Sequence, residues 1–187
     1  MSLLGLLLIN LATLIILTFA LWMLSLVLRD ASIIDIFWGM GFVVVAWISA
    51  SLAGWPAARA VLLIVMTTLW GVRLSGYLAW RNIGEPEDRR YREMRSHWGD
   101  RFPWISLFTV FWLQAAILWV VSFPLQTGMR TTQSLGLLDA IGFGLWSVGL
   151  FFESVGDAQL ARFKSNPNND DKVFDEGLWR YTRHPNY

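Results

Sequence analysis

The chain has 187 residues, of which 55% are hydrophobic and 16% charged, with a formal net charge of +1 and a mean hydropathy of +0.46. This composition is too apolar for a soluble domain of this length. The sequence contains no Cys and two His, which excludes a disulfide framework and a thiolate zinc site. We therefore expect an all-α, polytopic membrane protein that uses neither a metal nor a nucleic acid.

Five apolar stretches are long enough, or nearly so, to cross a bilayer, for which about 20 mostly apolar residues are needed. They are residues 3–28, 36–52, 57–80, 104–125 and 135–152. The first is expected to be a membrane anchor rather than a signal peptide, because it lacks a basic start and a cleavage site and its apolar run is too long. We expect one membrane domain over residues 1–187, without an internal repeat or linker.

Segments outside the spans carry most of the charge. A short surface helix is expected at residues 88–98, and a cytoplasmic cofactor-binding segment at residues 153–187. Basic residues concentrate at position 29, in residues 81–101 and after residue 161, whereas the opposite side has only Arg59 and Arg130. Because basic loops stay in the cytoplasm, this distribution predicts an external N-terminus and a cytoplasmic tail in a bacterial inner membrane. The basic loop 81–101 also predicts contact with anionic membrane lipids.

Arg73 is a charged residue within the third span, about 10 Å from its cytoplasmic end at 1.5 Å per residue. Its spacing places it on one helix face with Trp70, Tyr77 and Trp80. Burying a charge at this depth is costly. Two interpretations remain open: the side chain extends to the membrane surface, or it is an inward cation that binds an anion.

Three acidic residues are expected in the same cytoplasmic half of the bundle as Arg73. Asp35 begins the second span, while Glu153 and Asp157 follow the fifth. These groups can converge on one cavity. For Asp35 the alternative is an interfacial acid that is favourably placed at a helix N-terminus.

The end of the chain has a distinctive motif, Arg183-His184-Pro185-Asn186-Tyr187, preceded by Gly177-Leu178-Trp179-Arg180-Tyr181. This motif resembles the nucleotide-binding signature of the steroid 5-alpha-reductase and sterol reductase superfamily. The resemblance covers residues 30–187 and is nearest to a bacterial branch of unknown function. It also rests on the spacing of Asp157, Leu160 and Lys164, on Arg73-x-x-x-Tyr77, on Asp35-Ile36-Phe37-Trp38-Gly39 and on the loop 84–98.

The resemblance implies reduction by NADPH of a carbon-carbon double bond conjugated to a carbonyl, in a steroid-like or other lipid. The cofactor supplies the hydride, and the protein supplies orientation and an acid. Basic side chains suited to the NADPH phosphates are Arg162, Lys164, Arg180 and Arg183, with Arg73 as a further candidate. Amide, ribose or phosphate contacts are implied for His184, Asn186 and Tyr187, while Asp157 suits a ribose hydroxyl, the nicotinamide amide or an Arg.

The sequence departs from the superfamily at the catalytic positions. Steroid reductases have a Gln-Glu pair on the second helix and a Tyr three residues before the third-helix Arg, where this chain has Asp35 and Trp70. A desolvated, protonated Asp35 could donate to the carbonyl oxygen, with Tyr77 as the second donor. These differences at Asp35 and Trp70 leave the substrate open. Glu153 stands where steroid reductases have an Asn, so the nicotinamide contact made there does not carry over.

Superfamily members also continue past the final Tyr with about two further helices, which implies about seven in all. On this comparison we expect a C-terminally truncated chain that is inactive alone. Two other classes remain open. Isoprenylcysteine-type methyltransferases share an Arg-His-Pro-x-Tyr motif that serves S-adenosylmethionine, and a non-catalytic lipid-binding protein would need no cofactor.

Overall fold

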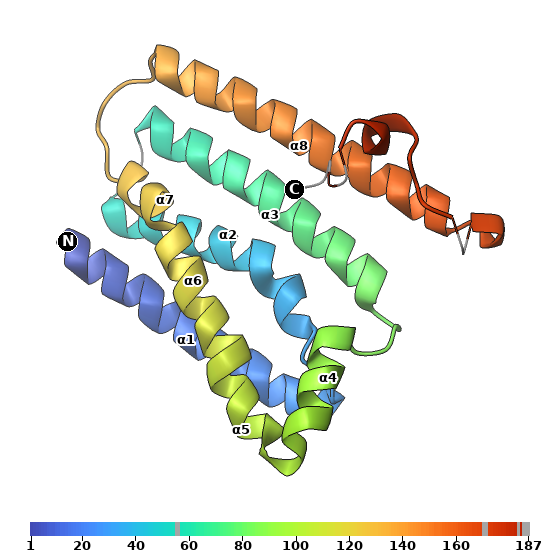
Figure 1. Cartoon of the computed structure of the whole chain (residues 1–187). Helices are drawn as coiled ribbons and strands as arrows, with labels where there is room; N and C mark the ends of the chain where they lie inside the picture. Colours follow the sequence, from blue (N-terminus) through green and yellow to red (C-terminus); the bar gives the residue numbers. More distant parts are fainter. Residues whose placement is uncertain (55–56, 170–171, 183, 185–187) are drawn as a thin grey trace. The chain divides into compact units, whose positions relative to one another are not determined.

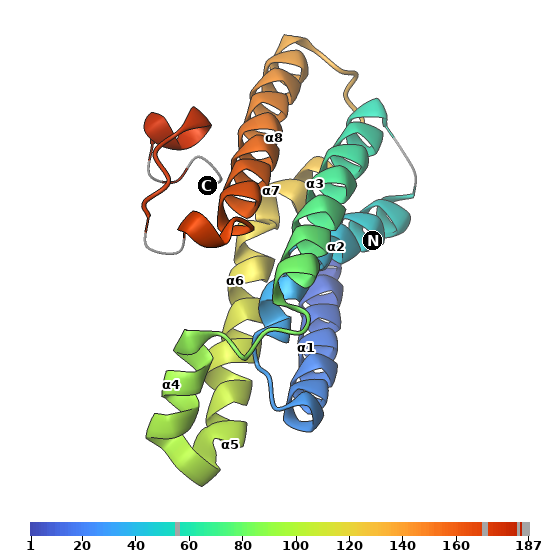
Figure 2. The ribbon, with the colours of Figure 1, turned by 90° about the vertical axis from the view of Figure 1, so that its right-hand side faces the viewer.

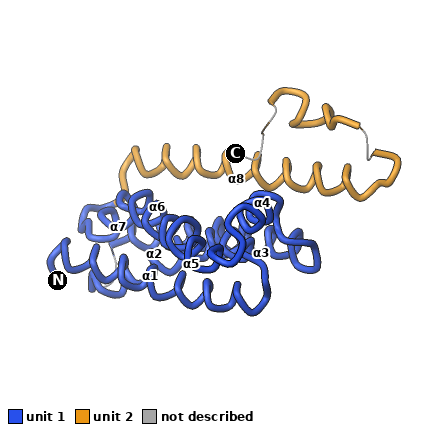
Figure 3. The backbone as a smooth tube through the Cα atoms, turned by 60° about the horizontal axis from the view of Figure 1, so that its bottom comes forward, with its two compact units in different colours: residues 1–134 blue, residues 135–187 orange. Residues whose placement is uncertain are grey.

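The structure of the protein, a computed structural model, describes residues 1–54, 57–169, 172–182 and 184. It is all-helical, and the described residues form no strand (Figure 1). The chain divides into two compact units, Met1–Ser134 and Leu135–Tyr187, which are described separately below (Figure 3). Among the described residues, five helical segments are long and apolar enough to cross a membrane. The prediction of an all-α membrane protein with five spanning helices is therefore confirmed.

The first unit contains four of the five candidate spans. Its elements are α1 (Leu3–Leu28), α2 (Ile33–Ala53), α3 (Ala58–Asn82), α4 (Arg89–Trp98), a 3-10 turn (Gly99–Arg101), α5 (Phe102–Ser106), a π-helix (Leu107–Trp112), α6 (Leu113–Val121) and α7 (Phe123–Gly128). The expected surface helix at residues 88–98 is confirmed as α4. The fourth span is less regular than expected, because it includes a π-helix and is interrupted at Ser122.

The second unit consists of α8 (Leu137–Lys164), two 3-10 turns (Pro167–Asn169 and Gly177–Arg180) and the segments around them. Helix α8 has 28 residues and is therefore about 42 Å long. The hydrocarbon core of a bilayer is about 30 Å thick. About two turns therefore exceed the membrane thickness, and α8 continues through residues 153–164, past the expected end of the span at residue 152.

Helices α2 and α3 lie side by side in both ribbon views and make the most extensive helix contact of the first unit (Figures 1 and 2). A Cβ atom added to Gly39 would collide with the backbone of Gly71, and one added to Gly71 would collide with the backbone of Gly39. One turn along α3, Ser75 Oγ accepts a hydrogen bond of 3.1 Å from the Met40 N–H. Small residues on both helices therefore set their separation.

The polar helix α4 is attached to this bundle through an apolar cluster at the end of α1, and it lies beside α5 (Figure 2). Tyr91 is 5% exposed and packs in the same cluster as Trp22, Ile34 and Phe111. Its neighbours in sequence are exposed arginines. One buried aromatic ring therefore anchors an otherwise charged helix.

Candidate functional site

The start of α4 is joined to the turn between α1 and α2 by hydrogen bonds. The Asp88 side chain caps the helix by accepting from the Arg90 N–H at 2.9 Å. The Asp88 N–H donates to Ser32 Oγ at 2.8 Å, and Glu87 Oε1 accepts from the Ala31 N–H at 2.8 Å. These bonds connect segments that are more than 50 residues apart, so they fix α4 beside the beginning of α2.

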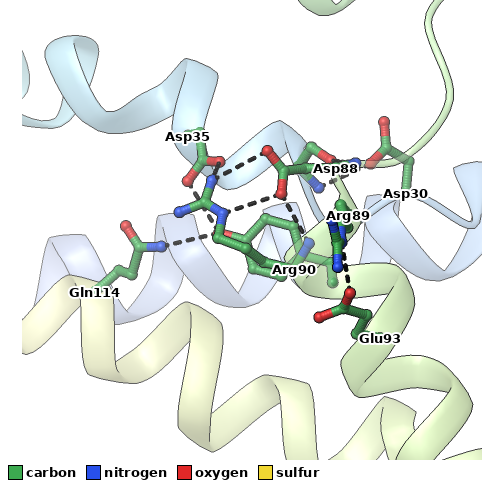
Figure 4. Close-up of polar contacts among 9 residues, drawn as sticks. Asp30, Asp35, Asp88, Arg89, Arg90, Glu93 and Gln114 are labelled. Atoms are coloured by element: carbon green, nitrogen blue, oxygen red, sulfur yellow. Dashed lines mark hydrogen bonds and ion pairs between the residues drawn. The ribbon is translucent and has the colours of Figure 1, made fainter.

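A polar cluster at this junction surrounds Asp35, the predicted acid (Figure 4). Asp35 Oδ1 accepts from the Tyr91 hydroxyl at 2.9 Å, and Oδ2 accepts from Arg90 Nη2 at 2.9 Å. Gln114 Nε2 donates in turn to the Tyr91 oxygen at 3.3 Å. Both carboxylate oxygens thus have a donor, and the Asp35 side chain is only 21% exposed.

The pKa values of two groups in this cluster, Asp88 and Tyr91, are shifted by their surroundings. Both residues precede the apolar part of the fourth span. The hydrogen bond from the Arg90 side chain lowers the pKa of Asp88 below its ordinary value. Burial raises the pKa of the Tyr91 hydroxyl, and the negative charge of Asp35 raises it further. Tyr91 is therefore held in its protonated form, as a hydrogen-bond donor.

Sequence reasoning did not find Arg90 and Tyr91 as partners of Asp35, or Gln114 as a partner of Tyr91. The sequence identifies Arg90 only as one of the basic residues of the loop 81–101. A usable signal was present, since Tyr91 is an isolated aromatic residue among the arginines of a short helix, and such a residue marks the face that is buried.

The predicted face of α3 is present. The guanidinium carbon of Arg73 lies 5.7 Å from the ring centroid of Tyr77, and that of Arg81 lies 6.0 Å from the same centroid. The rings of Tyr77 and Trp80 are 5.9 Å apart. The Asp35 side chain accepts hydrogen bonds from Arg90 and Tyr91, on α4 rather than on α3.

In the second unit, the segment before the motif folds back onto α8. The Leu178 N–H donates to Gln159 Oε1 at 3.0 Å, and Trp179 Nε1 donates to the Gly156 carbonyl at 3.0 Å. Gly177 supplies the left-handed backbone of this turn, with φ of 59°. The tail is thereby docked beside Asp157, which is 5% exposed.

An aromatic stack reinforces this docking. The rings of Phe163 and Phe174 are stacked with centroids 4.7 Å apart, and Trp179 follows at 6.1 Å from Phe174. Aromatic pairs at such separations contribute about 0.5–1.5 kcal/mol beyond the burial of their area. These ring contacts therefore join the end of α8 to the segment that precedes the motif.

The basic residues around these contacts face solvent. Arg162, Lys164 and Arg180 are exposed, and none has a hydrogen-bond or ion-pair partner within the part of the chain that the structure describes. His184 is also exposed, and its N–H donates to Thr182 Oγ1 at 3.4 Å. The predicted residues Arg183, Asn186 and Tyr187 lie outside the described residues.

The predicted convergence of Asp35 and Arg73 with Glu153 and Asp157 stays a prediction, because the two pairs belong to different units. Among described residues, no three His, Asp or Glu side chains are grouped as metal ligands would be. A family model with the description "Protein of unknown function (DUF1295)" matches residues 21–187. No curated protein and no solved structure matches the chain.

Proposed function

Because the chain belongs to this DUF1295 family, which is related to steroid 5-alpha-reductase-like proteins, we propose that it is a multi-pass membrane oxidoreductase. In this proposal it uses NADPH to reduce a carbon-carbon double bond conjugated to a carbonyl, in a steroid-like or other lipid. The observation that supports it best is in the second unit, where Asp157 is buried and Arg162, Lys164 and Arg180 have no partner among the described residues.

These residues fit the chemistry of NADPH. The cofactor carries a pyrophosphate and a 2′-phosphate, and Arg162, Lys164 and Arg180 have no competing acidic partner among the described residues. Charge-assisted hydrogen bonds from such groups to phosphate are stronger than neutral ones. Asp157 repels phosphate and would instead accept from a ribose hydroxyl or the nicotinamide amide, and the motif residues Arg183, His184, Asn186 and Tyr187 would complete the binding segment.

When bound, NADPH supplies the hydride. The protein must then orient the lipid and polarise its carbonyl. We propose Asp35 and Tyr77 as these polar groups, with Asp35 acting through Tyr91, whose hydroxyl donates to Asp35 Oδ1 at 2.9 Å. Since burial and Asp35 keep that phenol protonated, Tyr91 would polarise a carbonyl by hydrogen bonding after turning from Asp35, rather than by losing its proton.

Ligand-induced thermal stabilisation of the full chain in lipid nanodiscs tests the proposal. A ligand at one hundred times its dissociation constant stabilises a protein by about 2.7 kcal/mol, which corresponds to a shift of about 5–11 °C for a chain of this size. We expect NADPH to act at lower concentration than NADH, because NADH lacks the 2′-phosphate, and S-adenosylmethionine to have no effect.

Single substitutions assign the phosphate contacts. One charged hydrogen bond is worth about 1.5–3 kcal/mol, or tenfold or more in affinity. Arg162→Ala or Arg180→Ala should therefore reduce the preference for NADPH about tenfold and leave NADH binding nearly unchanged. Arg130→Ala, in the first unit, is the control. Equal affinity for the two nucleotides, or stabilisation by S-adenosylmethionine alone, would refute the reductase proposal, and the second result would indicate a methyltransferase.

A further inference from the structure

Asn10 is a fully buried polar residue in α1, the most apolar helix of the chain. Its Nδ2 group donates to Ser49 Oγ on α2 at 2.8 Å and to Gln126 Oε1 on α7 at 2.9 Å. Gln126 and Ser49 are also fully buried. A buried amide costs free energy unless its hydrogen bonds are made. The three residues therefore form a polar network that joins three helices.

The orientation of both amides follows from their partners. Gln126 Nε2 donates to the Trp119 carbonyl at 3.2 Å and to Ser122 Oγ at 2.8 Å. A carbonyl oxygen can only accept, so the NH₂ group of Gln126 must face Trp119 and its Oε1 must face Asn10. Asn10 must then present its own NH₂ group to Gln126, which fixes the direction of Asn10 Oδ1.

Asn10 Oδ1 is consequently a buried acceptor with no hydrogen-bond partner among the described residues. Leaving a buried acceptor unsatisfied costs about 1–3 kcal/mol. No rotation of either amide relieves this cost, because the Trp119 carbonyl holds the whole network in one orientation. The missing partner must be a small hydrogen-bond donor.

The backbone beside this acceptor is irregular. Helix α6 ends at Val121 and α7 begins at Phe123, with Ser122 between them at ψ of 0°. Pro124 has no N–H, and the Trp119 carbonyl accepts from the Ser122 hydroxyl at 2.9 Å and from Gln126. At membrane depth, irregular backbone of this kind is tolerated where it is buried in protein or lines a hydrated cavity.

A cavity of about 130 Å³ is lined by Met1, Leu52, Ala53 and Arg130, at the ends of the helices that carry the network. Leu52 and Ala53 follow Ser49 by one turn of α2, and Arg130 follows Gln126 by four residues. Since a water molecule occupies about 30 Å³ in the liquid, this cavity has room for several. It therefore offers a source of water about one helical turn beyond Ser49 and Gln126 along the chain.

We propose that Asn10 Oδ1 binds a water molecule buried between α1, α2 and α7, which enters from the cavity at Arg130. Water fits because it is the smallest donor. A lipid hydroxyl would bring a chain into a region where Leu6 and Leu14, one turn on either side of Asn10, are fully buried. This binding site is independent of the proposed reductase activity.

Radiolytic footprinting of the parent protein in nanodiscs tests this inference, because hydroxyl radicals formed from a bound water oxidise the side chains next to it. We expect oxidation of Leu6 and Leu14 although both are 0% exposed. Phe111, also 0% exposed but in another apolar cluster, is the internal control. Each oxidation rate is divided by the intrinsic reactivity of its side chain with hydroxyl radical, which is higher for Phe than for Leu. Normalised oxidation of Leu6 and Leu14 no greater than that of Phe111 would overturn the proposal.

The double variant Asn10→Leu with Gln126→Met removes both side-chain amides. Neither amide oxygen then remains to accept a hydrogen bond from a water molecule. Its oxidation at Leu6 and Leu14 should fall to the level of Phe111. Persistent oxidation in a folded double variant would show that Asn10 does not hold the water. If this variant does not fold, the comparison of Leu6 and Leu14 with Phe111 in the parent protein is sufficient to test the proposal.

Discussion

The contact between α2 and α3 makes a sharp prediction about two glycines on the same helix. A Cβ at Gly71 would collide with the Gly39 carbonyl and with the side chain of Val43, whereas a Cβ at Gly76 would meet no atom within 4 Å. The obstacle at Gly71 is backbone and cannot turn aside. Gly71→Ala must therefore separate the two helices.

The magnitude follows from two opposing effects. Overpacking a buried contact costs about 1–3 kcal/mol, and the upper part of this range applies where backbone must move. Alanine is favoured over glycine within a helix by about 1 kcal/mol. Gly76→Ala gains only the second effect. We expect the melting temperature to fall by about 2–8 °C for Gly71→Ala and to rise by about 2–4 °C for Gly76→Ala.

Thermal unfolding followed by intrinsic Trp fluorescence in detergent or nanodiscs measures both variants, since the chain has twelve Trp residues. Each variant should first be shown to insert and to migrate as the parent does on size-exclusion chromatography. If Gly71→Ala is as stable as Gly76→Ala, the two helices do not approach as closely as the structure shows.

Three further predictions concern charged groups of the first unit. Tyr91→Phe should lower the melting temperature by about 3–12 °C in the same assay, because it removes a hydrogen bond to the Asp35 carboxylate worth about 1.5–3 kcal/mol. An unchanged melting temperature would refute this hydrogen bond. Arg90 lowers the pKa of Asp88, so the stability that this pair contributes is present above about pH 4 and is lost as the pH falls through the lower folded pKa. Arg90→Gln should flatten that acid limb in pH-dependent melting, and an unaltered limb would exclude the pair as its cause. Finally, Arg90→Cys and Arg130→Cys should react with a membrane-impermeant thiol reagent from opposite sides, and labelling from the same side would contradict the topology.

The number of candidate membrane spans could be predicted from hydropathy, but the end of α8 could not. Apolar character declines at Glu153, and a span was therefore expected to stop at residue 152. The helix continues to Lys164 because charged residues are good helix formers once they leave the hydrocarbon. Hydropathy thus locates the membrane boundary and not the end of the helix.

The partners of the polar residues could not be predicted for a different reason. Asp35 is bonded to residues 55 and 56 positions further along the chain, and Asn10 to residues 39 and 116 positions away. Helical periodicity reports only neighbours within about four residues. The face containing Arg73 and Tyr77 is local and was found, whereas the two polar clusters depend on tertiary packing.

The basic loop shows how one sequence feature can carry two predictions of different strength. Residues 81–101 contain six arginines, but five acidic residues lie among them. Three of the arginines form ion pairs within the protein: Arg89 with Glu93, Arg90 with Asp35 and Asp88, and Arg95 with Glu87. An arginine that is paired with a carboxylate attracts anionic lipid weakly, because the net charge of the pair is near zero. The topological argument is unaffected, since orientation follows the number of basic residues and acidic residues contribute little to it. The ion pairs therefore weaken the prediction that this loop binds anionic lipid. One of them, between Arg90 and Asp35, also helps to hold the charged helix α4 on the apolar bundle. The predicted cytoplasmic position of the loop is unchanged.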